Sequence, residues 1–124
     1  FDHEQDAVTF NADSIKKALT EHFAISPATA LTPEIITRAA RHMMQEVDTV
    51  HGGLGGAPKF PQLTKLRLLF DHGLREGQRA YDDAVLHALV QMCRGGLYDH
   101  IGGGFHRYCV DGAWLVPHFE KMLD

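Results

Sequence analysis

The chain has 124 residues, a size typical of one domain, and its hydrophobic fraction of 44% and charged fraction of 23% are ordinary for a soluble globular protein. Its formal net charge of −4 at pH 7 argues against nucleic acid as a partner, because phosphates require a basic surface. No apolar stretch approaches the roughly 20 residues that span a bilayer, and no cluster of Lys and Arg would hold an anionic membrane.

The opening sequence FDHEQDAVTFN has no initiator Met and no signal-peptide pattern, so we expect the chain to be a piece of a longer protein. This stretch is polar and aperiodic, which predicts a tail or linker. Asn11 or Asp13 is a candidate cap for a short helix that follows. Within that helix, apolar residues recur at helical spacing, at Ile15, Ala18, Leu19 and Phe23. Residues 1–30 are therefore expected to form a connector.

The next helix has a clear start signal. Thr32 is a good cap residue, Pro33 suits the first helical position, and Glu34 lies in the first turn. Apolar residues then recur with a helical period, and they predict a helix that runs to about Asp48: Ile35, Ile36, Ala39, Met43 and Val47.

Two further helices are predicted after the glycine-rich segment HGGLGGAPKFPQ, which suits neither a helix nor a central strand. One runs from about Gln62 to Arg75 and is ended by Gly77. Its apolar face consists of Leu63, Leu66, Leu69, Phe70 and Leu74. The other runs from about Arg79 to Arg94 and is ended by two glycines, 95 and 96. Its apolar face consists of Ala84, Val85, Ala88, Leu89 and Met92.

A β-hairpin is predicted near residues 105–116, because FHRYCV and AWLV are extended runs joined by the turn dipeptide Asp111-Gly112. This turn pairs Val110 with Ala113, Tyr108 with Leu115 and His106 with Pro117. Pro117 then favours a final helix in PHFEKMLD, residues 117–124. The predicted fold is all-α, with antiparallel helical hairpins and this one short β-hairpin.

Several common sites are excluded by their spacing. The stretch GGLGGAPK does not fit a phosphate-binding loop, because Ala57-Pro58 stands where Gly-Lys is needed. The group His100, His106, His118 and Glu120 matches no zinc spacing, so we expect no metal and no cofactor.

The two cysteines do not form a redox pair, because no C-x-x-C motif contains them. Cys93 is expected to be a small buried residue. Two isolated thiols fit a reducing compartment, so a cytoplasmic location is expected.

The candidate catalytic residues are His106, His118 and Glu120. Histidine suits proton transfer because its ordinary pKa of about 6.5 lies near neutrality, and a carboxylate can assist it. A loop or half-buried histidine, and a glutamate that only compensates a helix dipole, are the alternatives. Alternation along a strand places His106 and Arg107 on opposite faces, so they can share a pocket only if the strand twists or bulges.

The candidate substrate-binding residues are Lys59, Arg107, Tyr108 and Lys121. Lys59 lies between Pro58 and Pro61, which hold it rigidly and could present it to a pocket. A solvated lysine is the alternative.

Two long motifs carry a family resemblance: GGLGGAPKFP, and GGLYDHIGGGFHRYCVDGAWLVPHFEKML after two helices. From about Leu31 to Leu123, the chain resembles the thioredoxin-domain-containing family that includes spermatogenesis-associated thioredoxin-like protein. Cys109 stands where the family pattern has Ser, and Asp124 where it has Tyr.

The resemblance implies that residues 31–124 are the first hairpins of an (α/α)6 toroid, like those of sugar epimerases and six-hairpin glycosidases. Residues 1–30 would then follow a thioredoxin-like domain that the chain lacks. A sugar-like substrate would bind where the loops gather, near Lys59, His106, Arg107, His118, Glu120 and Lys121. The fragment alone is expected to be inactive and to self-associate through helix faces left uncovered.

The alternative hypothesis is a non-catalytic module that docks the thioredoxin-like domain. Convergence of the polar residues on one cavity would favour the enzyme. Convergence of the aromatic residues with outward-pointing charges would favour the docking module.

Overall fold

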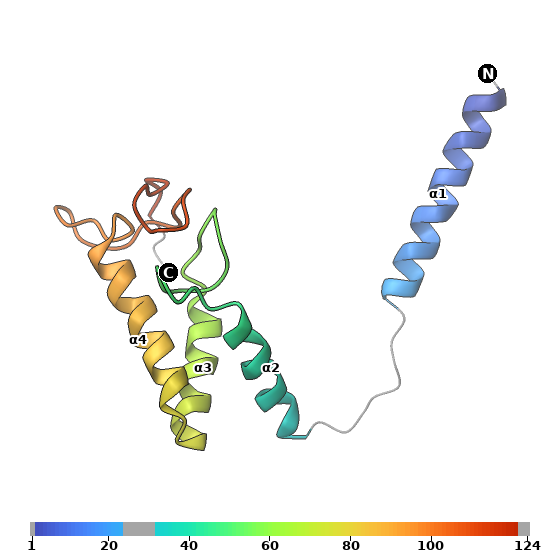
Figure 1. Ribbon diagram of the computed structural model, residues 1–124. Coiled ribbons are helices and arrows are strands. Elements are labelled where there is room, and N and C mark those ends of the chain that lie inside the picture. Colours follow the sequence, from blue (N-terminus) through green and yellow to red (C-terminus); the bar gives the residue numbers. More distant parts are fainter. Residues whose placement is uncertain (1, 24–31, 122–124) are drawn as a thin grey trace. The chain divides into compact units, whose positions relative to one another are not determined.

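The computed structural model describes residues 2–23 and 32–121, with side chains from Phe10 onward in the first stretch (Figure 1). The described chain is all-α, as the sequence predicts. The helices are α1 (Asp2–His22), α2 (Glu34–Gln45), α3 (Leu63–Glu76) and α4 (Arg79–Arg94). The chain divides into two units, Phe1–Leu31 and Thr32–Asp124, which are treated separately below.

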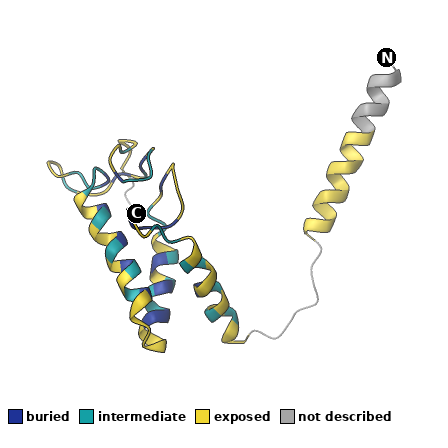
Figure 2. Ribbon diagram, in the orientation of Figure 1, coloured by how far each residue is buried: buried dark blue, intermediate teal, exposed yellow. Residues whose placement is uncertain are grey.

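The first unit contains α1, and the prediction of a polar tail ahead of a short helix is wrong, because the helix begins at Asp2. The apolar residues Phe10, Ile15, Leu19 and Phe23 are all exposed within this unit (Figure 2).

In the second unit, α3 packs against both α2 and α4, and a two-residue connection makes α3 and α4 a helical hairpin. Gly77 ends α3 in the left-handed conformation with φ of 65°, as its position in the sequence predicts. The faces that meet contain the buried residues Ala40, Leu66, Leu69, Tyr81, Val85, Ala88 and Met92 (Figure 2).

The predicted limits of α3 and α4 agree with the structure, but α2 ends at Gln45 instead of about Asp48. Beyond Gln45 the chain turns back, so that Val47 bridges to Leu54. The Asp48 carboxylate accepts hydrogen bonds from the backbone N–H groups of Val50 and His51, both at 2.9 Å. This local competition with the helix explains the earlier end.

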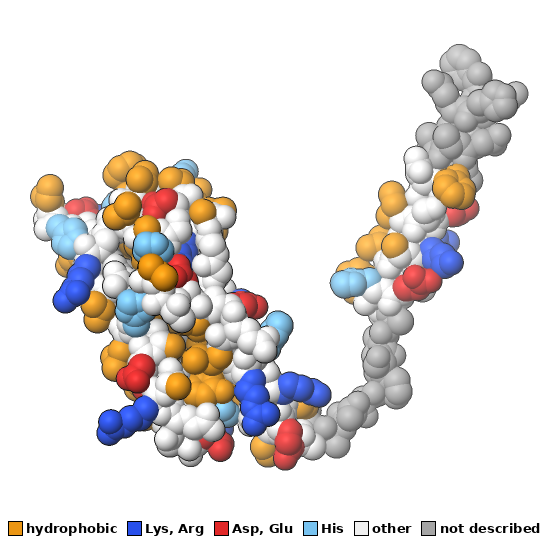
Figure 3. All heavy atoms as spheres, viewed as in Figure 1, with side chains coloured by type: hydrophobic (Ala, Val, Ile, Leu, Met, Phe, Trp, Pro, Cys, Tyr) orange, Lys and Arg blue, Asp and Glu red, His pale blue; other side chains and the backbone are white. Residues whose placement is uncertain are grey.

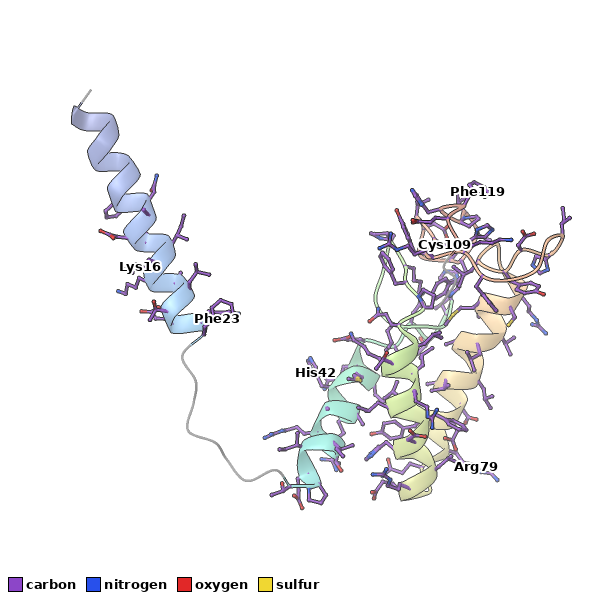
Figure 4. The ribbon with its side chains drawn as sticks, turned by 180° about the vertical axis from the view of Figure 1, so that it is seen from behind. Lys16, Phe23, His42, Arg79, Cys109 and Phe119 are labelled. Carbon is purple, nitrogen blue, oxygen red and sulfur yellow. The ribbon has the colours of Figure 1, made fainter. Side chains whose placement is uncertain are left out.

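Residues 46–62 and 95–121 gather at one end of the helices of the second unit, and they are called the loop layer here (Figure 1). Figure 4 shows Cys109 and Phe119 in this layer and Arg79 at the opposite end of α4. Within the described residues the layer has no β-strand, only isolated antiparallel bridges such as Lys59 with Cys109 and Cys109 with Pro117.

The predicted two-residue turn at Asp111-Gly112 is wrong. Val110 donates its backbone N–H to Val116, and His118 donates to Tyr108, so residues 111–115 form a five-residue loop. The Asp111 carboxylate closes this loop by accepting the N–H groups of Ala113, Leu115 and Val116. An aspartate that binds several backbone groups fixes a wider loop than the Asp-Gly dipeptide implies.

The predicted final helix at 117–124 is also wrong over its described part, because residues 117–121 run extended beside 106–109. Backbone bonds from His118 to Tyr108 and from Arg107 to Glu120 use groups that a helix would need. Tertiary pairing therefore overrides the helix signal of Pro117. Residues 122–124 lie outside the described residues.

Trp114 is the centre of the loop layer. Its side chain is fully buried, and its indole N–H donates to the carbonyl oxygens of His51 and Gly52 at 2.9 and 3.2 Å. Its backbone has φ of 62°, in the left-handed region that is unfavourable for a bulky residue. The surroundings therefore hold Trp114 in a strained conformation, and the contacts of its ring offset that strain.

The glycine clusters make room around this residue. A Cβ atom at Gly53 would lie 2.6 Å from the Trp114 ring, and one at Gly95 would fall on the Trp114 carbonyl oxygen. One at Gly52 would lie 2.9 Å from Ala88 in α4. Gly95 is not in the left-handed conformation of a helix cap, since its φ is −82°. Its missing side chain instead lets the backbone of Trp114 lie close to it.

Lys59 lies beneath the Trp114 ring, with its ammonium 5.2 Å from the ring centroid, a cation–π arrangement. The Lys59 side chain is fully buried, and its Nζ donates to Asp48 Oδ2 at 2.5 Å and to the Gly112 carbonyl at 2.9 Å. Burial alone would raise the pKa of Asp48, but hydrogen bonds from Lys59, His51 and Val50 outweigh it and lower the pKa to about 2.

The substitution Gly95→Ala should lower the free energy of unfolding by about 1–3 kcal/mol, because the added methyl group clashes with Trp114 backbone. Gly56→Ala is the matched control, since nothing lies within 4 Å of its added Cβ. Urea unfolding should show a clearly lower midpoint for Gly95→Ala and an almost unchanged midpoint for Gly56→Ala. Equal midpoints would contradict the packing role of Gly95.

The substitution Lys59→Met should cost about 3 kcal/mol of stability, because it leaves the Asp48 carboxylate without its cation. Lys121→Met is the control, since it breaks a more exposed ion pair with Asp99 and should cost much less. Thermal unfolding of both variants measures the difference. A Lys59→Met protein as stable as Lys121→Met would show that the buried pair is dispensable.

Stability should fall as the pH drops from about 4 to about 2 through protonation of Asp48, whose folded pKa is about 2 against an ordinary value of about 3.9. A carboxyl with a lowered folded pKa contributes stability above its unfolded pKa and loses it on acidification. The variant Asp48→Asn should be less stable than the unsubstituted protein near neutrality. Between pH 4 and pH 2 it should lose less stability than the unsubstituted protein. Parallel unfolding curves against pH for both proteins would exclude Asp48 as a cause.

Candidate functional site

The loop layer meets α4 at a cavity of about 430 Å³. Leu89, Met92 and Cys93 of α4 form one wall. Pro61 and Leu63, which precede and begin α3, contribute another part of the lining. Leu97 and residues 105–107 complete it. The volume lies in the range of small-molecule sites, roughly 300–1,000 Å³.

His106 is the buried polar residue of this cavity. Its side chain is only 8% exposed, its backbone N–H donates to Leu97 at 2.8 Å, and its ring lies edge-on to Phe119 at 5.5 Å. Among the described residues, no group forms a hydrogen bond with its buried Nδ1 atom. Because this atom has almost no accessible surface, a molecule in the cavity does not contact it in this conformation, and His106 contributes other parts of the residue to the lining.

Arg107 also lines the cavity, with about half of its side chain exposed. Its guanidinium donates to Glu120 Oε2 at 3.1 Å, and its backbone N–H donates to the Glu120 carbonyl at 2.8 Å. Glu120 therefore holds Arg107 in place at the edge of the cavity. A guanidinium has five N–H donors, so this pair leaves others available.

The segment that pairs with residues 106–109 contains a bulge beside the cavity. Arg107 bonds to Glu120 and His118 bonds to Tyr108, so Phe119 is an extra residue between the two bonds. Such a bulge changes the register and increases the local twist.

His118 and Tyr108 lie in a stack of rings instead. The His118 ring is stacked on Tyr108 with centroids 4.8 Å apart, and Tyr108 is stacked on Phe60 at 4.6 Å. None of the three is part of the cavity lining. His118 and Phe60 are exposed, so the stack forms part of the surface of the loop layer.

Lys121 forms a separate ion pair. Its Nζ donates to Asp99 Oδ2 at 2.6 Å and to the Gly103 carbonyl at 2.8 Å. The hydrogen bond from Lys121 and those from the N–H groups of Gly102 and Ile101 hold the pKa of Asp99 well below its usual range. This arrangement fixes the loop that contains the third glycine cluster.

The structure therefore brings together two of the proposed site residues, His106 and Arg107, with Glu120 bonded to the latter. It separates Lys59, which is enclosed with Asp48, from Lys121, which is paired with Asp99. Each proposed cation has a carboxylate partner, and His106 has none among the described residues.

Sequence reasoning missed the residues that organise the site, Asp48, Asp99, Asp111 and Trp114. The three aspartates share a signal, since each begins a turn in which its carboxylate binds N–H groups two or three residues ahead. Trp114 has no such signal, because a buried tryptophan with positive φ depends on contacts remote in sequence.

The two cysteines differ in environment. Cys93 is exposed and lines the cavity, so the prediction of a buried Cys93 is wrong, because the cavity leaves its side of α4 uncovered. Cys109 is buried, and burial, followed by the charge of Asp111, raises its thiol pKa to about 11. A thiol with so high a pKa is unreactive near neutral pH.

In residues 2–23 and 32–121 there is no group of three or more His, Cys, Asp or Glu side chains placed to hold a metal ion. None of the described helices combines the length and the apolar character that crossing a bilayer requires.

Comparison with known proteins identifies relatives of the chain, although no protein-family model matches it. It is 40% identical to spermatogenesis-associated protein 20 from Mus musculus and to that from Homo sapiens, over 91% of this chain in each case. It is 42% identical, over 73% of its length, to uncharacterized protein B0495.5 from Caenorhabditis elegans.

The chain spans 15% of the length of the two mammalian proteins and 13% of the nematode protein. These proteins are homologues of the chain, which is similar to one segment of each.

Proposed function

We propose that the chain is a segment of a protein of the spermatogenesis-associated protein 20 type, and that it supplies one wall of a small-molecule site in an all-α, carbohydrate-active domain. Identity of 40% over 91% of the chain supports the assignment to this protein type. The (α/α)6 toroid, an adjoining thioredoxin-like domain and a sugar-like ligand are parts of the proposal that rest on the motif resemblance. The free thiols of Cys93 and Cys109 support a reducing compartment such as the cytoplasm.

One observation carries the proposal: His106, which is nearly buried, and its neighbour Arg107 both line a cavity of about 430 Å³. A histidine that lines such a cavity can donate or accept a proton at a sugar hydroxyl. Arg107 beside it can donate hydrogen bonds to hydroxyl or anionic oxygens.

The other candidate residues receive supporting roles in this proposal. Glu120 orients Arg107 through their ion pair. Lys121 and Lys59 hold loops in place through their carboxylates, and Tyr108 with His118 forms an aromatic surface beside the site. In the longer protein, His118 and this surface are positioned for a part of the ligand that extends beyond the cavity.

A docking module for a thioredoxin-like domain is the second candidate, and a specific observation favours it. The loop layer exposes several large apolar side chains, which gather on its surface (Figure 3): Phe60, Ile101, Phe105, Val110, Leu115, Val116 and Phe119. Exposed apolar patches of this kind support a protein partner, and in the isolated chain they support self-association.

Binding of glucose and glucose 6-phosphate to this chain, followed by chemical-shift changes in NMR spectra, tests the site. We expect weak binding that His106→Phe reduces about tenfold, because the variant keeps a ring but loses its hydrogen-bonding nitrogens. His42→Phe is the control, since His42 lies on α2 and is largely exposed. Binding that is unchanged in His106→Phe would reject the carbohydrate site and leave the docking module.

A further inference from the structure

We propose that α4 is a dimerisation helix, which packs antiparallel against α4 of a second copy of the chain and covers the open side of the cavity. This inference goes beyond the proposed function, because it needs neither a sugar nor any other ligand. It follows from an apolar stripe on α4 that the hydrophobic core does not use, and from the charges beside that stripe.

Two apolar stripes run along α4. The first is buried in the core: Tyr81, Val85, Ala88 and Met92. The second is exposed and is called the outer stripe here: Leu86, Leu89, Val90 and Cys93. The steps of three, four and seven positions from Leu86 place these side chains on one side of the helix. Since Leu86, Leu89 and Val90 are 54%, 40% and 41% exposed, the outer stripe offers apolar surface to a partner.

The outer stripe is accessible because α4 lies at the edge of the three helices of the second unit, with α3 between it and α2 (Figure 1). Leu89 and Cys93 belong both to the outer stripe and to the lining of the cavity, so the stripe leads into the cavity. A helix that packs along the outer stripe therefore covers the cavity at the same time.

The charges beside the outer stripe favour a second copy of the chain as the partner. Asp83 near the start of α4 and Arg94 at its end are both exposed, and they are about three full turns apart, so they lie on the same flank of the stripe. In an antiparallel pair of identical helices the same flanks face each other, and the start of each helix lies beside the end of the other. Asp83 of each copy then lies opposite Arg94 of the other copy, which gives two equivalent ion pairs.

The same symmetry determines which apolar residues meet. Leu89 and Val90 lie near the two-fold axis, because they are at the centre of the outer stripe. Leu86 and Cys93 are at its two ends, so Leu86 of one copy lies opposite Cys93 of the other. Leu86 of the second copy thereby reaches the cavity wall at Cys93 and becomes part of its lining. The contact removes apolar surface of both copies from water and places opposite ends of the two helix dipoles side by side.

Sedimentation equilibrium over a range of micromolar concentrations tests the dimer. We expect a Kd in the micromolar range, because the contact is small. Val90→Glu should raise Kd about tenfold or more, since two carboxylates would meet near the two-fold axis, and it spares the core because Val90 is exposed. Ile36→Glu on α2 and Leu115→Glu in the loop layer, both at exposed positions, are the controls and should leave Kd unchanged.

A charge exchange tests the antiparallel arrangement. Asp83→Arg alone should raise Kd about fivefold, because it places two arginines opposite each other. The double variant Asp83→Arg with Arg94→Asp should restore the original Kd. A double variant that binds no better than Asp83→Arg would show that these residues do not meet and would overturn the arrangement.

Disulfide cross-linking with copper phenanthroline tests the register. Leu86→Cys should form a covalent dimer through Cys93 of the second copy. The unsubstituted chain should form none, because its two Cys93 residues would lie about 10 Å apart along the helix axes, beyond the roughly 7 Å between Cα atoms that a disulfide can bridge. Positions 86 and 93 of one copy are separated by the same distance, so the bond must join two copies.

The outcomes are distinct. A chain that stays monomeric at all concentrations would overturn the inference and leave the outer stripe to another segment of the longer protein. Dissociation by Leu115→Glu but not by Val90→Glu would place the contact in the loop layer and overturn it as well. Cross-linking of the unsubstituted chain through Cys93, or none in Leu86→Cys, would reject the antiparallel register.

Glucose binding is measured separately, so the inference and the proposed function can fail independently. A monomer whose glucose binding is weakened by His106→Phe would reject the dimer and leave the carbohydrate site. A dimer whose glucose binding is unchanged in His106→Phe would reject the carbohydrate site and leave the dimer.

Discussion

The loop layer depends on the enclosure of one side chain, Trp114, in a backbone conformation that is unfavourable for it. The glycines at 53 and 95 leave space for its ring and its carbonyl group, and the carbonyls of the first glycine loop accept its N–H. Lys59 lies against its face and joins the two halves of the layer through Asp48 and Gly112. Segments about 60 residues apart in sequence are thereby held in one place, and the walls of the cavity follow from that arrangement.

This constraint also determines how the polar groups are used. The proposed site is rich in charge in the sequence, yet in the structure each cation named as a site residue is bonded to a carboxylate. These three ion pairs join segments of the loop layer, so their geometry supports a role in positioning those segments. The imidazole of His106 differs from them, because it is nearly buried and its Nδ1 has no partner in the described part of the chain. The chemistry proposed for the site is therefore concentrated on one residue and its neighbour Arg107.

The sequence predicts α3 and α4 closely, because their apolar periodicity is strong and glycine follows each of them. It places His106 and Arg107 on opposite faces of a strand, whereas both residues line the cavity in the structure, beside a bulge at Phe119 that no local signal in the sequence marks. The final helix was wrong because pairing with residues 106–109 outweighs the helix signal of Pro117. The two-residue turn was wrong because the Asp111 carboxylate accepts N–H groups of residues 113, 115 and 116 and so fixes a wider loop. The role of Trp114 could not be inferred from its neighbours in sequence, since its partners are His51, Gly52 and Lys59.

Trp114 is the single tryptophan of the chain, and it belongs to the loop layer, whereas the regular helices contain none. Its intrinsic fluorescence is thus a natural probe of that layer alone, while far-ultraviolet circular dichroism reports mainly on the helices. A condition that opened the glycine loops without melting the helices would shift the emission of the indole to longer wavelength and leave the dichroism unchanged. Measured together, the two optical signals show whether the loop layer and the helices unfold in one transition or in two.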